Sequence, residues 1–384
     1  MAAHRLFSHT DPSPPPRIFL AANSAWNLLH YRRPLIEAMR QEGWEVVGLV
    51  PDPPTGEELL SRWQRVPYLR GQARSPLDDL RALRGFFNIY RREKPDLALH
   101  FTIKPNIFGG LAARLAGMPA IPTLTGLGYT ALHPTGANRL VPFLYRQAFA
   151  RAPWVVVQNE DDRDWLLTRQ LIRPEQCRLI RGSGVDTERF QPQDTLRTSA
   201  TPLVCLYIGR LLEDKGVLEL IEAVGNLRAS GLDLECRFLG DPSHANPSAI
   251  PESSFRRMID REGFRYLGPA EDVRPALAVA DLLVLPSYRE GTPRAVLEAM
   301  AMGIPVITTD VAGCRQTVDP GRTGLLVPPA DARALEDAIR QMAVMTNEKR
   351  QAMGRAGREK VIREFDQRIV VSQYLELIST YVRP

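Results

Sequence analysis

A chain of 384 residues suggests two domains, and 44% hydrophobic residues allow each domain to bury a core of its own. The net charge of +5 fits anionic substrates or an acidic membrane surface, whereas the sequence lacks the zinc-finger spacing, aromatic motifs and charge blocks typical of nucleic-acid binding. The four cysteines are widely spread without a C-x-x-C pair, which argues for a reducing compartment and against a zinc site or a disulfide framework.

Residues 1–16, MAAHRLFSHTDPSPPP, lack the apolar core of a signal peptide. Their proline-rich end predicts a disordered leader before the first strand. The longest apolar runs of the chain fall far short of the ~20 residues that a membrane-spanning helix needs. We therefore expect a folded chain that begins near residue 17.

Strands and helices alternate from Arg17 onward, which is typical of a parallel α/β domain. RIFLAAN indicates a short buried strand, and WEVVGLVP indicates the next one. Between them we predict a helix over residues 28–42 that ends at Gly43.

A basic amphipathic helix is predicted over residues 77–93. Its leucines and aromatic residues recur with helical period, and the surrounding residues 57–94 are rich in arginine. Two interpretations stay open. Either the apolar face packs on the domain core and the arginines face water, or part of the basic surface faces anionic lipid, where each charge contributes ~1 kcal/mol.

Polar side chains follow the next predicted strand, DLALHF, at its carboxyl end. We expect His100, Thr102, Lys104 and Asn106 to face one crevice, because ligands bind at this edge of a parallel sheet. His100 and the more distant His133 are candidates for acceptor contacts and, equally, for structural histidines.

Asn159 is predicted to cap a helix that starts at Glu160, after the buried strand PWVVVQN. Asp162 and Asp164 form a D-x-D in the first turn of that helix. Acidic side chains favour the helix dipole there, so we interpret the motif without a metal.

A polar, proline-containing segment over residues 187–201 predicts an interdomain linker. It separates a first domain over residues 17–186 from a second domain over residues 202–364.

Two cations follow the first strand of the second domain. The strand LVCLYI ends at Gly209 and Arg210, and Lys215 precedes a helix. Fixed cations at the carboxyl end of a strand, close to a helix start, suit a diphosphate.

The stretch 281–310 has the clearest boundaries in the chain. An apolar run over residues 282–285 predicts a strand that is buried on both faces. A polar loop then leads to a helix with Thr292 as N-cap, Pro293 in the first position and Gly303 at the end.

This arrangement places Glu290 on the loop at the carboxyl end of the strand and Glu298 within the helix. The start of the helix offers free N–H groups and a partial positive charge. Two carboxylates beside such an anion site suit a ligand with both phosphates and hydroxyl groups, such as a nucleotide-sugar.

The spacing Glu290-x7-Glu298 within EGTPRAVLEAMAMGIPVI resembles the donor-site signature of glycosyltransferase family 4, retaining enzymes of the GT-B fold. HFTIKPNIFGGLAARLAGMPAIPTLTGLGY resembles a subgroup that extends lipid-linked oligosaccharides in bacteria, including N-acetylgalactosaminyltransferases that act on undecaprenyl-diphosphate-linked sugars. The resemblance implies an α/β fold with two Rossmann-like domains facing a central cleft. It also implies that residues 365–384 form a closing helix that crosses back to the first domain.

The resemblance further implies transfer from a UDP-sugar with no cofactor and no metal. The implied catalytic residues are Arg210, Lys215 and Glu290. The implied donor-binding residues are Gly209, Gly291, Thr292, Pro293, Glu298, Gly240 and Asn246. The implied acceptor-side residues are Asn23, His100, Lys104, Asn106, Thr125 and Gly126. Thr125 stands where many relatives have a histidine, so no catalytic histidine is expected there.

The implied partners are a UDP-sugar donor, a lipid-linked saccharide acceptor and an anionic membrane surface, and nucleic acid is not expected. The resemblance also implies that the protein binds peripherally to the inner face of the bacterial cytoplasmic membrane. There it would act in O-antigen, capsule or lipopolysaccharide assembly. Two other functions stay open. One is a UDP-N-acetylglucosamine 2-epimerase, which shares the fold and needs no acceptor, and the other is a non-catalytic sugar-nucleotide-binding protein.

Overall fold

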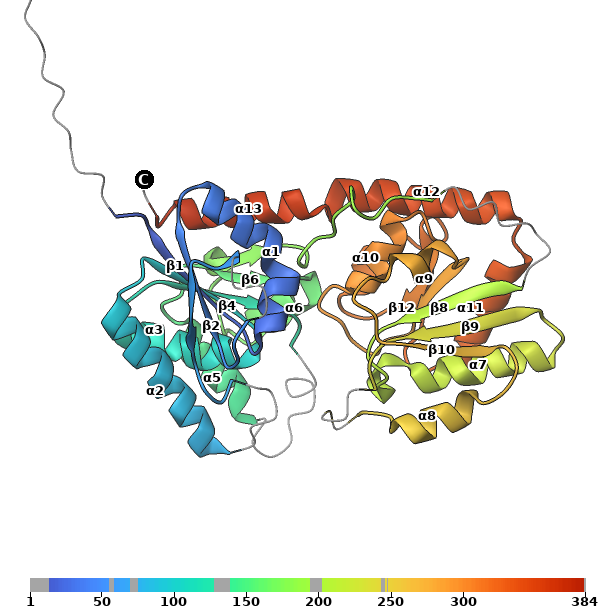
Figure 1. The fold of residues 1–384 in the computed structure, drawn as a ribbon, viewed down its shortest axis with the longest axis horizontal. Helices are drawn as coiled ribbons and strands as arrows, with labels where there is room; N and C mark the ends of the chain where they lie inside the picture. The colour runs from blue at the N-terminus through green and yellow to red at the C-terminus, as the bar shows by residue number, and fades with distance from the viewer. Residues whose placement is uncertain are drawn as a thin grey trace, which may run out of the picture.

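The computed structural model of the protein describes residues 14–54, 59–69, 75–127, 139–193, 202–242, 246 and 248–382. These residues form two α/β lobes, each built on one sheet (Figure 1). All strand pairs of both sheets are parallel, which confirms the predicted fold class.

The first lobe has a seven-stranded sheet in the order β3-β2-β1-β4-β5-β6-β7. Its strands are β1 (Arg17–Ala21), β2 (Glu45–Val50), β3 (Arg62–Arg65), β4 (Leu97–Phe101), β5 (Ala120–Leu124), β6 (Val155–Val157) and β7 (Cys177–Leu179). Its helices include α1 (Ala25–Gln41), α2 (Pro76–Glu93), α3 (Gly110–Ala116), α5 (Val141–Phe149) and α6 (Glu160–Thr168).

The second lobe has a six-stranded sheet in the order β10-β9-β8-β11-β12-β13. Its strands are β8 (Leu203–Ile208), β9 (Leu234–Leu239), β10 (Phe264–Gly268), β11 (Leu282–Leu285), β12 (Val306–Thr309) and β13 (Gly324–Val327). Its helices include α7 (Val217–Ala229), α8 (Glu252–Ile259), α9 (Arg274–Ala278), α10 (Arg294–Ala301), α11 (Ala332–Val344) and α12 (Asn347–Glu364).

The last helix, α13 (Gln367–Ser379), packs on the first lobe, although the chain reaches it from the second lobe. Helices α12 and α13 run in line along one side of the molecule (Figure 1). Tyr374 of α13 is fully buried, and its hydroxyl lies 2.9 Å from Thr123 Oγ1 at the end of β5. α13 thus belongs to the apolar cluster that covers β1 and β4.

The start of α1 lies before its predicted position. Ser24 Oγ accepts a hydrogen bond from Asn27 N at 3.1 Å, so the helix begins at Ala25 and not at residue 28. Ser24 is a favoured capping residue, and its signal was present in the sequence. The early start places the first turn of α1 directly after β1, at the carboxyl edge of the first sheet.

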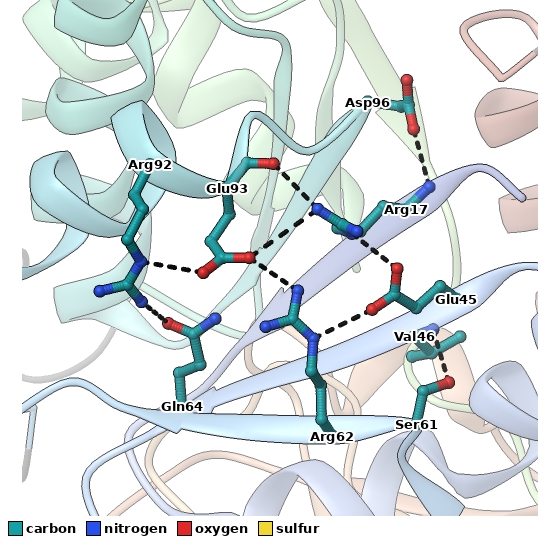
Figure 2. Close-up of polar contacts among 9 residues, drawn as sticks. All are labelled: Arg17, Glu45, Val46, Ser61, Arg62, Gln64, Arg92, Glu93 and Asp96. Carbon is teal, nitrogen blue, oxygen red and sulfur yellow. Dashed lines mark hydrogen bonds and ion pairs between the residues drawn. The ribbon is translucent and has the colours of Figure 1, made fainter. Parts of the chain in front are cut away.

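Ion pairs close the opposite, amino edge of the first sheet (Figure 2). Arg17 at the start of β1 and Arg62 at the start of β3 both bind Glu45 at the start of β2, at 2.6 and 3.0 Å. Arg62 also donates to Glu93 at the end of α2 at 2.7 Å, and this bond is the main reason that the pKa of Glu93 falls to about 2. The positive and negative charges at this edge balance one another, so we assign this ion-pair network a structural role.

Chain order reverses between β1 and β4 in the first sheet and between β8 and β11 in the second. Crevices for ligands form at such reversals, outside the carboxyl ends of the strands. The loops after these four strands are therefore the ones that matter for function. No helix among the described residues is both long and apolar enough to cross a bilayer.

Candidate functional site

The loop between β11 and α10 carries Glu290 and is fixed by the loop after β12. Glu290 N donates to Ala312 O at 3.2 Å. Gly313 has a φ of +80°, and a Cβ at this position would lie 2.4 Å from Glu290 O. Only glycine allows this approach, so the backbone at Glu290 is held firmly from within its own lobe.

The boundaries predicted for this unit are largely confirmed. β11 spans the expected residues, and Gly303 has a φ of +73°, as a left-handed residue after a helix should. The predicted cap is wrong. Pro293 is the N-cap and Arg294 the first helical residue, because Thr292 Oγ1 instead donates to Gly291 O at 3.0 Å and to Gln158 O of the first lobe at 3.4 Å.

An ion pair joins the carboxyl ends of β8 and β11. Lys215 Nζ lies 2.5 Å from Glu290 Oε1, and their side chains are 16% and 18% exposed. Gly216, with a φ of +70°, allows the approach, because a Cβ there would lie 2.2 Å from Pro286 O. The cation and the carboxylate that the sequence singled out are therefore direct neighbours.

Arg210 lies at the end of the same strand, β8, and its side chain is exposed. Its carbonyl oxygen accepts a hydrogen bond from Tyr207 Oη at 2.7 Å. The preceding Gly209 touches the next loop, because a Cβ on Gly240 would lie 1.8 Å from Gly209 O. Within the described residues, Arg210 forms no ion pair, so its charge is free to meet an anion.

Asn246 belongs to the loop that follows β9 and Gly240. Its Oδ1 accepts hydrogen bonds from Ser248 N at 3.0 Å and from Ser248 Oγ at 2.9 Å. The side chain thus shapes the turn that leads back to β8, where Glu213 N donates to Ser248 O at 2.8 Å.

Glu298 lies one turn into α10 and pairs with Arg294 at 3.1 Å. Burial raises the pKa of the Glu298 carboxyl, and Arg294 opposes the rise. Arg294 also reaches the first lobe, where it lies 5.3 Å from the ring of Tyr31. The pair therefore forms a second cation–carboxylate unit at the boundary between the lobes.

Tyr31 of α1 was not singled out from the sequence, yet its ring contacts Arg294 of the second lobe. Burial raises the pKa of its hydroxyl, and the charges of Arg294, Glu298, Arg210 and Glu290 act on the same group. Of these side chains, Arg294 contacts the Tyr31 ring and carries Glu298 with it, so this ion pair of the second lobe lies beside α1 of the first lobe. No sequence pattern marks a tyrosine in the second turn of a helix as a residue that contacts the opposite lobe.

Three predicted acceptor-side residues, Asn23, Thr125 and Gly126, lie at the carboxyl edge of the first sheet, together with Thr102. Asn23 N donates to Thr102 Oγ1 at 3.2 Å, which links the loops after β1 and β4. The loop after β5 touches the other lobe, because a Cβ on Gly291 would lie 2.4 Å from Thr125 O, and one on Gly126 would lie 3.3 Å from Gly291 N. Thr125 and Gly126 thus abut the Glu290 loop.

His100 and Asn106 do not face the crevice, and this expectation is wrong. His100 is 0% exposed and hydrogen-bonds through Nε2 to Tyr90 Oη at 2.7 Å, and burial lowers its pKa to about 3. Asn106 is also buried and donates to Thr123 O at 2.8 Å. β4 is buried on both faces, so His100 points into the core, and Asn106 lies in the buried helical turn Pro105–Gly109 that follows the strand.

Lys104 is mostly buried and engaged within its own lobe. Its Nζ lies 2.9 Å from Asp79 Oδ1 of α2 and 3.3 Å from Tyr68 O. His133 lies outside the described residues.

The D-x-D aspartates take different partners. Asp164 is exposed and pairs with Arg163 at 2.8 Å, whereas Asp162 is buried and accepts from Arg289 of the second lobe. Asn159 caps α6 as predicted, with its Oδ1 accepting from Asp162 N at 2.7 Å. Across the described ranges, no three His, Cys, Asp or Glu side chains are grouped to hold a metal ion.

Both halves of the chain are similar to known glycosyltransferases. A family model described as "Glycosyltransferase Family 4" matches residues 12–189, and one described as "Glycosyl transferases group 1" matches residues 202–344. The N,N'-diacetylbacillosaminyl-diphospho-undecaprenol alpha-1,3-N-acetylgalactosaminyltransferase of Campylobacter jejuni is 26% identical over 387 residues, covering 96% of this chain and 99% of that protein. The UDP-Gal:alpha-D-GlcNAc-diphosphoundecaprenol alpha-1,3-galactosyltransferase of Escherichia coli is 25% identical over 76% of this chain and 77% of its own.

Solved structures show the same fold. The crystal structure of Anabaena HepE in complex with UDP-glucose superposes with a TM-score of 0.76 at 18% identity, covering 95% of this chain and 99% of that one. Sucrose-phosphate synthase from Thermosynechococcus elongatus superposes with a TM-score of 0.79 at 22% identity, covering 95% and 98%.

Proposed function

Because the chain belongs to glycosyltransferase family 4, we propose that it transfers a sugar from a UDP-sugar to a saccharide carried on a polyprenyl diphosphate, with retention of the anomeric configuration. We propose an N-acetylhexosamine as the sugar, in assembly of a surface polysaccharide or a lipid-linked glycan. The names of the Campylobacter and Escherichia relatives, which act on undecaprenol-diphosphate-linked sugars, support the acceptor class.

The observation that carries the proposal is the Lys215–Glu290 ion pair at the reversal point of the second sheet, where Arg210 lies exposed just after β8. As the glycosidic bond breaks, the leaving diphosphate gains negative charge. We propose that Arg210, Lys215 and the free N–H groups at the start of α10 stabilise that charge without a metal ion.

The remaining donor contacts follow from the same geometry. We propose that Glu290 accepts hydrogen bonds from the sugar hydroxyls and that Glu298 accepts them from the ribose diol. The remaining proposed donor-binding residues are Gly209, Gly240, Gly291, Thr292, Pro293 and Asn246.

The acceptor hydroxyl is proposed to attack C1 of the sugar on the same face from which the diphosphate leaves. The bond from C1 to the acceptor oxygen forms, the bond from C1 to the phosphate oxygen breaks, and the hydroxyl proton passes to the leaving phosphate. No separate general base is then needed, which agrees with Thr125 at a position where many relatives have histidine. Asn23, Thr125 and Gly126 are the acceptor-side residues we retain for direct contact.

We also propose that the first lobe rests on anionic lipid at the inner face of the cytoplasmic membrane. Leu77 and Leu80, in the first turns of α2, are 64% and 60% exposed, although their periodicity suggested burial. Arg81 and Arg84 lie exposed beside them on the same helix. Exposed leucines flanked by arginines suit the headgroup region of a membrane that carries the lipid-linked acceptor.

One experiment tests the central proposal. The protein is incubated with a panel of UDP-sugars and short polyprenyl-diphosphate-linked acceptors, and the products are identified by mass spectrometry. A glycosylated acceptor that appears with one or a few of the UDP-sugars is the expected result. Isomerised donor formed without acceptor would assign an epimerase instead, and UDP-sugar binding without any product would assign a binding protein.

A further inference from the structure

The two residues that flank Glu290 are both held by the first lobe. Arg289 Nη2 donates to Asp162 Oδ1 in the first turn of α6. Gly291 O accepts a hydrogen bond from Asn159 Nδ2, the cap of the same helix, at 3.0 Å. Asn159 Nδ2 also donates to Asp162 Oδ2 at 3.0 Å, so the cap and the carboxylate form one unit.

Burial makes the pairing of Asp162 with Arg289 costly to break. Asp162 is 0% exposed, and Asn159 is buried as well. Burial raises the pKa of the Asp162 carboxyl, and the charge of Arg289 is the strongest influence that lowers it again. Removing one partner of such a pair leaves an uncompensated charge in the interior, which is far costlier than losing an exposed pair.

The second lobe holds the same loop from its other side. Glu290 is anchored there through its backbone N to Ala312 O and through its carboxylate to Lys215. The direction of the Glu290 side chain therefore depends on two sets of contacts, and one of these sets comes from the opposite lobe.

We infer that Asn159 and Asp162 are positioning residues, which fix the Glu290 loop for sugar transfer when the two lobes are in contact. They touch no substrate in this scheme and act through Arg289 and Gly291. The inference rests on the proposed function, because it assigns these residues to the geometry of the transfer step. Through these two residues, the first turn of α6, which contains the D-x-D motif, links contact between the lobes to the position of the Glu290 loop.

A neighbouring ion pair supplies the matched control. Arg315 of the second lobe binds Asp161 of the first lobe at 2.9 Å, and their side chains are 46% and 39% exposed. This pair also joins α6 to the second lobe, yet it does not flank Glu290. If Asp162 only strengthened the contact between the lobes, loss of the Arg315–Asp161 ion pair would lower kcat to a comparable extent.

The test compares Asp162→Asn, Arg289→Gln, the double variant, Arg289→Lys and the control Arg315→Gln. For Asp162→Asn and Arg289→Gln we expect kcat to fall about 10- to 100-fold, because small misplacements of a catalytic group cost this much. The affinity for UDP, which binds the second lobe in this scheme, should change less than about threefold.

The double variant should lose no more activity than either single variant, since both remove one interaction. Arg289→Lys should recover part of the lost kcat, because the ammonium restores the charge but not the guanidinium geometry. Arg315→Gln should keep kcat within about threefold of the unchanged protein. Unchanged kcat in Asp162→Asn, or an equal loss in Arg315→Gln, would overturn the inference.

A second readout separates failure of the inference from failure of the proposed function. Labels at Leu115→Cys and Val344→Cys, which are exposed on opposite lobes, report the interlobe distance in a Cys177→Ser background. A broader distance distribution in Asp162→Asn, measured at a temperature where circular dichroism shows the variant still folded, supports the role of the contact even if no sugar is transferred. An unchanged distribution together with unchanged kcat refutes it, whereas an inactive unsubstituted protein refutes only the transferase proposal.

Discussion

Replacing Lys215 by alanine tests the proposed charge stabilisation most directly. In the structure, Lys215 Nζ lies 2.5 Å from Glu290, and only 16% of its side chain is exposed, so water screens its charge poorly. Removing one such group from a site that stabilises developing charge costs about 10²–10³ in turnover. We expect the lower end, about 10²-fold or about 2.7 kcal/mol, because Arg210 remains to meet the leaving diphosphate.

The effect on folding should be much smaller. Without Lys215, the Glu290 carboxylate keeps 18% of its surface in water and can be hydrated, so the free energy of unfolding should fall by only about 1 kcal/mol. A transfer assay with radiolabelled UDP-sugar measures kcat, and thermal unfolding measures stability. Lys349→Ala, which removes an exposed lysine of α12, is the control. Turnover of Lys215→Ala within about threefold of the unchanged protein would refute the role assigned to this cation.

Four further outcomes are expected. Glu298→Ala should weaken UDP binding while the fold persists, which calorimetry would measure, and wild-type UDP affinity would contradict the ribose contact. Glu93→Gln should lower the free energy of unfolding by roughly 1 kcal/mol at pH 7, whereas Glu376→Gln, at an exposed position of α13, should not. The pKa of Glu93 in the folded protein is about 2, below its ordinary value of 4.5. The stabilisation that its ion pairs provide is therefore fully present above pH 4.5 and is lost as the pH falls toward 2. In Glu93→Gln, the free energy of unfolding should lack this part of its decrease with falling pH. Leu77→Ser combined with Leu80→Ser should reduce sedimentation with anionic vesicles but not with neutral ones, and equal sedimentation would remove α2 from the membrane surface.

Sequence patterns predicted the strands and helices that carry the site, because buried parallel strands leave continuous apolar runs and helix ends leave local signals. β8 and β11 lie where expected, and Asn159 caps α6 as expected. Local signals also mislead where two of them compete. Thr292 and Pro293 both suit the start of a helix, and the contact with Gln158 of the other lobe decides between them.

Contacts between distant parts of the chain could not be predicted from a single sequence. The partner of Asp162 lies 127 residues away, and nothing near either residue specifies the other. The burial of His100 has the same origin. A histidine one residue before the end of a strand is compatible with an exposed rim and with a core, and only the packing of α2 against β4, which brings Tyr90 to its ring, selects the core.

The charges around the site explain why it should bind a diphosphate and not simply close on itself. Lys215 pairs with Glu290 and Arg294 with Glu298, which leaves Arg210 without a partner among these five side chains. That cation, Arg210, is exposed at the end of β8. A diphosphate arriving at Arg210 would compete with Glu290 for Lys215, and the Glu290 carboxylate would then be released toward the sugar hydroxyls. The Lys215–Glu290 pair thus keeps both side chains oriented in the free protein, and donor binding exchanges one ion pair for another instead of desolvating two isolated charges.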